Sequence, residues 1–256
     1  MRRDDRHPKR GSSSAPVPAA PPATARDIRR ALRRLANPRD AKVLRWFFKT
    51  GPGEYGEGDR FLGVRVPALR ALAREFPAAG ADAAGELLAS PFHEERLLGL
   101  LLLVRCFERG TPAERLAIFR LYLKNTASIN NWDLVDLSAP NIVGAHLAER
   151  DRSLLDRLAR SPSLWERRIA IVATHAFIRR GQFEDIFRIA DRLLGDREDL
   201  IHKAIGWMLR EAGKRDAAAL ESWLRPRCRR LPRTMLRYAI ERFPPAKRQA
   251  YLRGNP

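Results

Sequence analysis

The sequence predicts an all-α fold in which pairs of helices stack into one array. Three observations support this fold class. Alternating apolar and polar residues, which would indicate strands, are not sustained over any stretch after residue 26. Apolar residues instead recur at helical spacing, in segments joined by short turns. One type of segment also repeats along the chain, which is typical of helical-repeat proteins.

The first 26 residues are rich in Arg, Pro, Ser and Ala and contain no apolar run. Such a composition cannot bury enough apolar surface to offset the entropy of ordering, so we expect a disordered basic tail at residues 1–26. A secretory signal is disfavoured because it needs a hydrophobic core region, and an organelle transit peptide stays open as an alternative. We expect residues 27–256 to form a single helical-repeat domain.

Two stretches show the repeat most clearly. "SPFHEERLLGLLLLV" begins at Ser90 and "SPSLWERRIAIVATHAF" begins at Ser161, and both contain Ser-Pro, then Glu-Arg, then an apolar run. Their separation corresponds to about two units of a paired-helix repeat. Related units are expected at 126–140, 196–209 and 231–243. Shorter amphipathic helices are expected between them, at 111–125, 151–161, 183–194 and 217–228.

This organisation predicts a solenoid of the HEAT-like or armadillo-like kind. Because no helix pair buries its apolar face alone, neighbouring pairs stack into a curved array. The second helix of each pair then lines a concave face. We expect a monomer, since such an array needs no partner to complete its core.

The charge balance points to a polyanionic partner. Lys and Arg number 49 against 30 Asp and Glu, for a net charge of +19, and the first 26 residues carry only six basic and two acidic residues of that total. The excess therefore lies mainly on the folded region, which favours nucleic acid and predicts a concave basic groove. A basic surface without such a partner is the alternative.

Other classes of function find little support in the sequence. Cys106 and Cys228 are far apart and suit reduced thiols, so we expect a cytoplasmic protein. The five His residues form no ligand cluster, so we expect no metal and no cofactor. The longest apolar run, at 97–104, is too short to span a membrane and suits a buried helix.

The glycine-rich stretch "KTGPGEYGEGDRFLG", at 49–63, looks like a phosphate-binding loop. It follows a predicted helix instead of a strand, lacks the Gly-Lys-Ser/Thr ending, and carries three acidic residues that would repel phosphate. We expect a turn-forming connection with Tyr55 and Phe61 tucked inward. Since the cations Lys49 and Arg70 flank this stretch, we also expect it to border the groove.

Basic and aromatic residues recur on the second helices of successive units. They are Trp132, Arg167 or Arg168, Lys203 with Trp207, and Arg237. Within one unit, four residues at i, i+4, i+7 and i+11 share a helix face: Lys203, Trp207, Arg210 and Lys214. Such a face suits phosphates and stacked bases. A solvated charged stripe around one packed tryptophan is the alternative.

Two aspartates follow Trp132 in "NNWDLVDLSAP". Asn130 is a plausible N-cap, which places Asp133 at the third helical position, where capping explains it. Asp136 lies one turn past Trp132 on the same face, between apolar neighbours. An unpaired buried carboxylate is costly, so Asp136 must face a groove or a cation such as Arg168. A structural salt bridge is the alternative to a catalytic role.

Four segments together carry a resemblance to a known family: "FFKTGPGEYGEGDRFLGVRVPALR", "NNWDLVDLSAPNIVG", "WERRIAI" and "HKAIGWMLREAGKRD". From about Arg30 to Arg253, the chain resembles the AlkD-like DNA alkylation repair family, bacterial DNA glycosylases built from HEAT-like repeats. The resemblance implies a C-shaped solenoid whose concave basic face grips duplex DNA. It also implies release of cationic alkylated purines, chiefly 3-methyladenine and 7-methylguanine, without extrusion of the base.

The resemblance further implies roles for single residues. The matching cleft residues are Asp136 as the catalytic aspartate, Trp132 and Trp207 as cleft aromatics, and Arg168 as the arginine that supports the cleft. Lys203 and Arg210 match the family's basic face, and we expect further contacts to the DNA backbone from Lys49, Arg70, Arg167, Lys214 and Arg237. The chain departs from the family at Phe47, where a cleft tyrosine is usual, and in its longer glycine-rich connection.

A cationic alkylated purine is already a good leaving group, so one carboxylate that stabilises the developing sugar cation and places a water is sufficient. No lysine is placed beside Asp136 by the sequence pattern, which favours a monofunctional glycosylase without strand cleavage, and a lysine contributed by another repeat would overturn this expectation. Two rivals remain from the sequence alone. One is a non-catalytic relative that binds DNA by its shape, and the other is a protein-binding HEAT-type adaptor.

Overall fold

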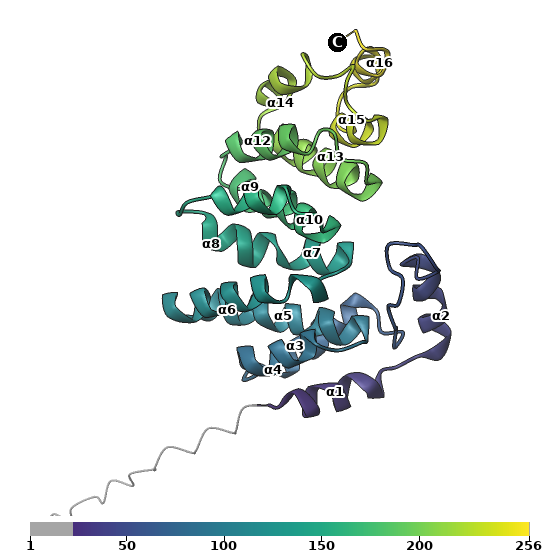
Figure 1. Ribbon diagram of the computed structural model, residues 1–256, viewed down its shortest axis with the longest axis vertical. Helices are drawn as coiled ribbons and strands as arrows, with labels where there is room; N and C mark the ends of the chain where they lie inside the picture. The colour runs from purple at the N-terminus through teal and green to yellow at the C-terminus, as the bar shows by residue number, and fades with distance from the viewer. Residues whose placement is uncertain (1–22, 256) are drawn as a thin grey trace, which may run out of the picture.

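Residues 23–255, which the computed structural model describes, are built from helices and turns. Among these residues there is a single isolated bridge, between Arg60 and Phe92, and no β-strand. The predicted all-α fold class is confirmed. Figure 1 shows the helices stacked one above another along the long axis of the molecule, from α1 at one end to α16 at the other.

The repeat units of the sequence appear as consecutive helix pairs. The first helices of the pairs are α4 (Ala81–Leu88), α6 (Pro112–Lys124), α9 (Ser153–Ala159), α12 (Glu184–Arg192) and α14 (Ala217–Leu224). The second helices are α5 (His93–Arg109), α7 (Trp132–Ser138), α10 (Leu164–Ala173), α13 (Asp199–Gly213) and α15 (Arg233–Ala239). The second helices pack on one another in succession, α5 on α7, α7 on α10, α10 on α13 and α13 on α15. This order is the one the repeat predicts.

Shorter elements extend or close the array. They are α1 (Ala25–Arg34), α2 (Pro38–Phe47) and α3 (Val66–Glu75) at the N-terminal end, the 3-10 turn η1 (Thr126–Ser128), α8 (Ala145–Leu147), α11 (His175–Ile178), and α16 (Pro245–Arg253) at the C-terminal end. Thr24 and Asp27 cap the start of α1 reciprocally, so the helical region begins two residues before the predicted boundary. The disorder expected for the tail lies outside the described residues up to residue 22. Within residues 23–255 no helix is both long and apolar enough to cross a bilayer.

Helix α7 continues into one π-helical turn, η2 (Pro140–Gly144). Proline has no N–H, so Pro140 cannot close the α-helical hydrogen bond to the carbonyl of Asp136. The amide of Gly144 instead bonds to the carbonyl of Ala139, five residues back. The helix therefore widens one turn after Asp136.

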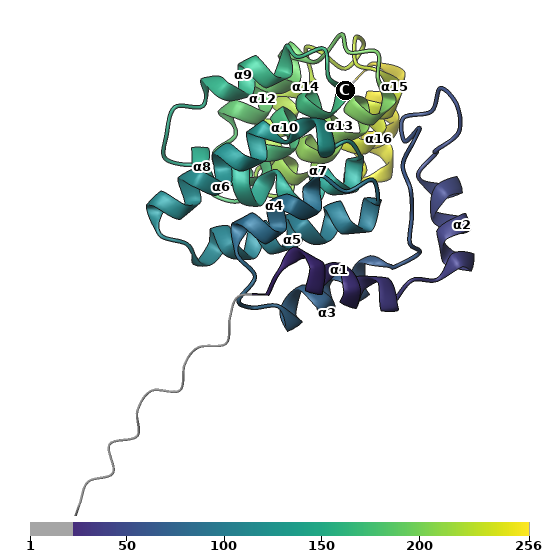
Figure 2. The ribbon, with the colours of Figure 1, turned by 60° about the horizontal axis from the view of Figure 1, so that its bottom comes forward.

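Helix α2 stands apart from the main array (Figure 2). It packs through a small separate core of Ala41, Phe48 and Phe61, with Leu44 and Trp132 at its edge. The main hydrophobic core runs through the remaining helices and does not include these residues. The position of α2 thus depends on the loop that follows it, residues 49–64.

Four consecutive charged residues at the start of α5 are buried, and three of them, His93, Glu94 and Arg96, hold this loop. Glu94 accepts hydrogen bonds from the backbone amides of residues 62, 63 and 64, at 2.9, 2.8 and 3.2 Å. Glu95 pairs with Arg29 and Arg33 of α1. The amides at the end of the glycine-rich stretch donate their hydrogen bonds to Glu94, so they do not form a phosphate-binding site.

His93 links the loop to α7. Its Nδ1 lies 3.0 Å from a carboxylate oxygen of Asp59, and its Nε2 lies 2.8 Å from one of Asp133. Arg96 also bonds to Asp59 and to the side chain of Asn130. Two buried cations therefore face two buried carboxylates, and three segments distant in the sequence meet at one imidazole.

Burial alone would lower the pKa of His93, but the adjacent carboxylates of Asp133 and Asp59 outweigh it and raise the pKa to about 9. Burial likewise acts to raise the pKa of Asp59, and His93 and Arg96 together hold it below its ordinary value. His93 is thus an imidazolium at neutral pH, with both ring N–H groups donating to carboxylates.

A stability measurement tests this linkage. A histidine whose folded-state pKa is raised stabilises the fold fully below its unfolded pKa of about 6.5, and that contribution disappears as the pH rises through about 9. We expect the free energy of unfolding to fall by roughly 3 kcal/mol between these limits. In the His93→Asn variant the protein should be less stable at pH 6.5, and most of the decline toward pH 9 should vanish. A wild-type decline that persists unchanged in His93→Asn would assign it to other groups.

Candidate active site and nucleic-acid interface

The carboxylate of Asp136, on α7, meets the guanidinium of Arg168, on α10. Arg168 donates from Nε to Oδ1 at 2.9 Å and from Nη2 to Oδ2 at 2.8 Å, a bidentate pair. Its remaining Nη1 donates to the carbonyl of Leu200 at the start of α13. The partner predicted for Asp136 is therefore confirmed, and Arg168 joins three successive second helices.

Asp136 is more open than its partner. Its side chain is 16% exposed and that of Arg168 is 6% exposed, so the carboxylate is the more accessible member of the pair. Burial raises the pKa of Asp136 above the ordinary range of an aspartate, and the charge and hydrogen bonds of Arg168 act against that rise. The carboxylate of Asp136 is therefore partly accessible, although its surroundings are apolar enough to raise its pKa.

Trp132 is held by aromatic neighbours on the α2 side. Its ring stacks on Phe48 with centroids 5.3 Å apart and planes at 18°, and Phe47 meets it edge-on at 6.0 Å. Phe48 stacks in turn on Phe61 at 5.1 Å. The orientation of Trp132 is thus set by the separate core below α2, not by the main core.

A cavity of about 690 Å³ brings the predicted groove residues together. Seven of them line it: Lys49, Trp132, Asp136, Arg168, Lys203, Trp207 and Arg210. They come from the loop after α2 and from α7, α10 and α13, which are successive layers of the array. Asp136 and Trp132 from α7 and Trp207 from α13 thus line one groove, and both tryptophans are half-buried at its surface.

The sequence did not point to four residues that line this cavity, Glu198, Asp199, Leu200 and Tyr238, and Tyr55 was placed differently. Tyr55 was expected to be tucked inward, yet it lines the groove, 6.2 Å from the ring of Trp165. Burial raises the pKa of the Tyr55 hydroxyl, while a hydrogen bond from Trp132 opposes the rise. The glycine-rich loop thus places the hydroxyl of Tyr55 in the groove, while Phe47 at the end of α2 contributes a ring without a hydroxyl.

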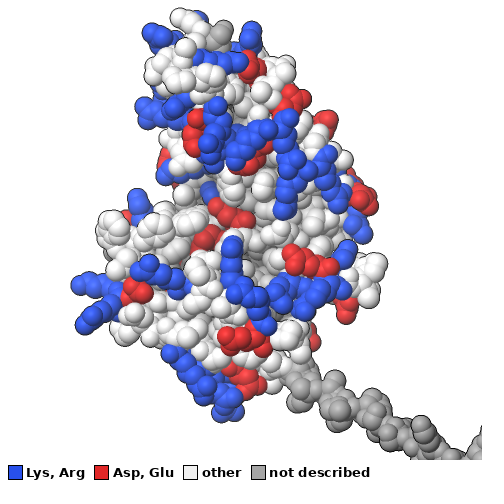
Figure 3. Space-filling view, turned by 180° about the vertical axis from the view of Figure 1, so that it is seen from behind, with Lys and Arg blue, Asp and Glu red and all other residues white. Residues whose placement is uncertain are grey.

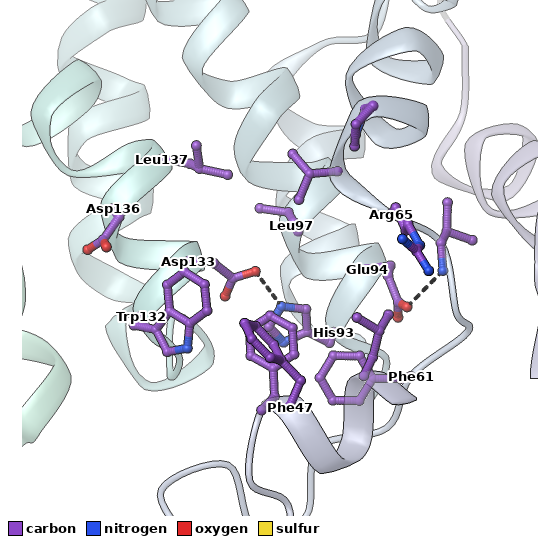
Figure 4. Close-up of a pocket in the computed structure, with 15 residues that line it drawn as sticks. Phe47, Phe61, Arg65, His93, Glu94, Leu97, Trp132, Asp133, Asp136 and Leu137 are labelled. Carbon is purple, nitrogen blue, oxygen red and sulfur yellow. Dashed lines mark hydrogen bonds and ion pairs between the residues drawn. The ribbon is translucent and has the colours of Figure 1, made fainter. Parts of the chain in front are cut away.

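A second cavity of about 400 Å³ lies on the other side of Trp132 and Asp136 (Figure 4). Its walls are mainly apolar and come from α2, the segment between α2 and α3, α3, α5 and α7: Leu44, Phe47, Phe48, Phe61, Val64, Val66, Pro67, Leu97 and Leu137. The polar side chains at its rim, such as Glu94 and Asp133, are already hydrogen-bonded to other groups. Asp136 therefore sits at the boundary between a polar groove and an apolar recess.

The cations of α13 are partly neutralised. Lys203 lies 2.8 Å from Asp199, Arg210 pairs with Glu241, and Lys214 lies 2.7 Å from Glu211. The hydrogen bond that Lys203 donates to the carboxylate of Asp199 raises the pKa of Lys203. Lys203 and Arg210 line the groove with Trp207 between them, whereas Lys214 does not.

Three further predicted cations line neither cavity. Arg167 turns to Asp196, at 2.6 Å, and to the carbonyls of Ser161 and Pro162, so its hydrogen bonds join neighbouring turns. Arg70 on α3 and Arg237 on α15 are exposed. Their contact with a DNA backbone stays a prediction. Between Arg167 and Arg168, only Arg168 reaches the groove.

The predicted cap of α7 was wrong by one residue. Asn131 is the N-cap, and its side-chain oxygen accepts from the amide of Trp132 at 2.9 Å, while Asn130 bonds to Arg96. Asp133 consequently stands at the second helical position and serves as a counter-ion to His93. The capping role expected for it is taken by Asn131, because a buried imidazolium is the stronger partner for a carboxylate.

Lys and Arg side chains form bands across the face shown in Figure 3, on both sides of a hollow. Acidic side chains are fewer there and lie partly within the hollow. Such a distribution attracts a polyanion to the two rims while leaving carboxylates in the middle.

Comparison with known proteins places the chain in a family. Residues 28–243 match the family model described as DNA alkylation repair enzyme. Among solved structures, the chain is similar to a predicted DNA alkylation repair enzyme from Enterococcus faecalis, with a TM-score of 0.63 and 18% identity, covering 82% of this chain and 97% of that chain. No curated protein matches. At that identity the structural likeness concerns the fold, but the family model spans well over half of the sequence. The chain therefore belongs to the DNA alkylation repair enzyme family.

Proposed function

We propose that the protein is a monofunctional DNA glycosylase that hydrolyses the N-glycosidic bond of cationic alkylated purines, such as 3-methyladenine and 7-methylguanine, in duplex DNA. The observation that carries the proposal is the position of Asp136. Its carboxylate, oriented by both arms of Arg168, lines a groove together with Trp132 and Trp207. Membership of a DNA alkylation repair family supports the substrate class.

The chemistry needs little from the protein. Alkylation at N3 or N7 makes the purine cationic, so the bond from C1′ to the ring nitrogen breaks with its electron pair returning to a neutral base. The sugar that remains has oxocarbenium character, and water then adds to C1′ and loses a proton. A fixed carboxylate beside C1′ stabilises the positive sugar and can accept a hydrogen bond from that water.

The surrounding residues support this step in different ways. Trp132 and Trp207 offer π-faces to the cationic base or to the deoxyribose. Lys49, Lys203 and Arg210 reach the groove and can contact phosphates, which fixes register without reading sequence. That the base stays in the stack during the reaction is part of the proposal and rests on the family resemblance.

Lys203 bears on whether the enzyme also cleaves the strand. A strand-cleaving glycosylase needs a neutral amine that attacks C1′. Lys203 lines the same cavity as Asp136, but its hydrogen bond to Asp199 raises its pKa and keeps it an ammonium. This favours hydrolysis by water and supports the monofunctional assignment.

A second candidate is a non-catalytic member of the family that binds DNA by its shape. The bidentate pairing favours it to a degree, because Arg168 engages both oxygens of Asp136 as a structural salt bridge would. In that case Asp136 only stabilises the fold and takes no part in a reaction. The two candidates differ in whether alkylated base is released.

The Asp136→Asn variant separates these candidates. With DNA that contains 7-methylguanine, the wild type should release free base, and the variant should do so at least about 100-fold more slowly because the charge facing the sugar is removed. Affinity for the DNA should change little. Asp82→Asn, an exposed substitution on α4, is the matched control. Wild-type release by Asp136→Asn would refute the catalytic assignment, and no release by the wild type would favour the shape-binding candidate.

The acid limb of the pH–rate profile reports Asp136. Only the ionised carboxylate stabilises the sugar, so the rate should fall with decreasing pH, at a midpoint above the value of about 4 usual for aspartate. Arg168→Lys keeps a positive charge but removes the paired hydrogen bonds. Since those bonds favour the ionised form, the midpoint should move to higher pH in the variant. An unmoved acid limb would mean that Arg168 does not set the ionisation of Asp136.

Salt titration tests the DNA contact of α13. Lys203→Ala should weaken binding to unmodified duplex about equally for all sequences, and the slope of log K against log salt should become shallower by at most about 0.9. Arg120→Ala, an exposed cation on α6, provides a control of like charge. An equal weakening in the two variants would point to general charge instead of a groove contact.

A further inference from the structure

Helix α2 presents an exposed tryptophan that the groove does not use. Trp46 is 82% exposed, more than any other large apolar side chain among residues 23–255. Val43 and Phe47 of the same helix are 55% and 52% exposed. Exposure of this degree in an indole is unusual for a surface without a partner.

The exposed face of α2 is also basic. Arg39, Lys42 and Trp46 follow i, i+3 and i+7 spacing and share the side opposite Ala41 and Phe48, which are buried. Arg45 and Lys49 extend the charge on either side of the tryptophan. These six residues, Arg39, Lys42, Val43, Arg45, Trp46 and Lys49, are called the α2 face below.

The carboxylates near the α2 face are engaged elsewhere. Asp40 pairs with Arg65 at 3.2 Å, and Glu54 and Glu57 accept hydrogen bonds from backbone amides of their own loop at 2.9 Å. In the described part of the chain, none of the four cations of the α2 face has an ion-pair partner. By contrast, the cations of α13 in the groove are paired. The α2 face thus carries the least neutralised charge beside the site.

The α2 face is continuous with the groove. Lys49 lines the groove, and Phe47, next to Trp46, lines both the groove and the apolar recess. Figures 1 and 2 show α2 standing off the array at the edge of the open side. A long polyanion lying in the groove therefore passes along α2 as it leaves.

We propose that the α2 face is a second DNA-binding element, which contacts the duplex beside the lesion, with its cations on phosphates and Trp46 against deoxyribose or a base edge. The inference rests on the proposed function for its ligand, and it adds a contact outside the cleft. Aromatic side chains flanked by cations suit such a surface because every nucleotide of a duplex offers an apolar sugar face beside a phosphate. Helix α2 supplies this contact without disturbing the main core, since it packs through its own small one.

The test uses the full chain and unmodified duplex DNA carrying a fluorescent label. Trp46→Ala should weaken binding about tenfold, as expected for loss of one well-packed aromatic contact at an interface, and Trp46→Phe should recover part of that affinity. The triple variant Arg39→Ala, Lys42→Ala, Arg45→Ala should reduce the salt slope by about 0.9 for each phosphate that these cations neutralise. Leu116→Ala and Arg120→Ala on α6, on the opposite side in Figure 1, are the matched apolar and cationic controls.

A second readout confirms the contact directly. Acrylamide should quench the Trp46 contribution, taken as the difference between wild type and Trp46→Phe, and duplex DNA should protect it. Unaltered thermal melts would show that the exposed substitutions leave the fold intact.

The outcomes distinguish this inference from the proposed function. If Lys203→Ala weakens binding while the α2 variants bind like the wild type, the α2 face is not a DNA contact and the groove assignment stands. If the wild type does not bind duplex DNA, both fall. If the α2 variants convert a dimer into a monomer on sedimentation without changing DNA affinity, the face is an interface between copies of the chain and the inference is overturned.

Discussion

The imidazolium of His93 is the constraint on which the geometry of the site depends. It joins Asp59 of the glycine-rich loop to Asp133 of α7 through two hydrogen bonds of 3.0 and 2.8 Å. Loss of the imidazolium leaves the buried carboxylate of Asp133 without its cation and leaves Asp59 with Arg96 as its remaining cation, which is far more costly than breaking a surface ion pair. The loop therefore keeps one position relative to α7, although α2 packs through a small core of its own.

A series of packed aromatic rings connects His93 to Trp132, which lies one turn before the catalytic candidate Asp136. The rings of Phe61 and His93 stack at 4.7 Å, Phe48 stacks on Phe61, and Trp132 stacks on Phe48. Aromatic contacts of this kind restrict rotation more than aliphatic ones, because a planar ring in a narrow slot has few orientations. Trp132 is in this way fixed one turn before Asp136, while Arg168 fixes Asp136 from the opposite side. The two constraints come from different layers of the array.

The fold and most of the residues that line the groove could be predicted from the sequence. The buried contacts of His93 that hold the glycine-rich loop against α7 could not. Helix periodicity and the repeat of Ser-Pro and Glu-Arg motifs predicted the helix pairs, because each pair depends mainly on its own apolar spacing. Asp136 and Arg168 were predicted as partners because the repeat places them at related positions of adjacent helices. His93 could not be paired with Asp59 and Asp133 in this way, since their contact depends on the path of an irregular loop. The signal that was present, four charged residues at the start of an apolar helix, indicates a buried polar cluster but not its partners.

The two cavities on either side of Asp136 give its carboxylate an asymmetric environment. On the α2 side the recess is walled by side chains such as Phe47, Val64 and Leu97 and offers no hydrogen bond to the carboxylate, and on the α13 side the groove is polar. A charge beside an apolar wall is screened less than one surrounded by water, so its attraction for a developing sugar cation is stronger. The same wall raises the pKa of Asp136, and without Arg168 the carboxylate would bind a proton more readily. Arg168 thus keeps Asp136 ionised beside the apolar recess. A carboxylate on an open surface would stay ionised without such a partner.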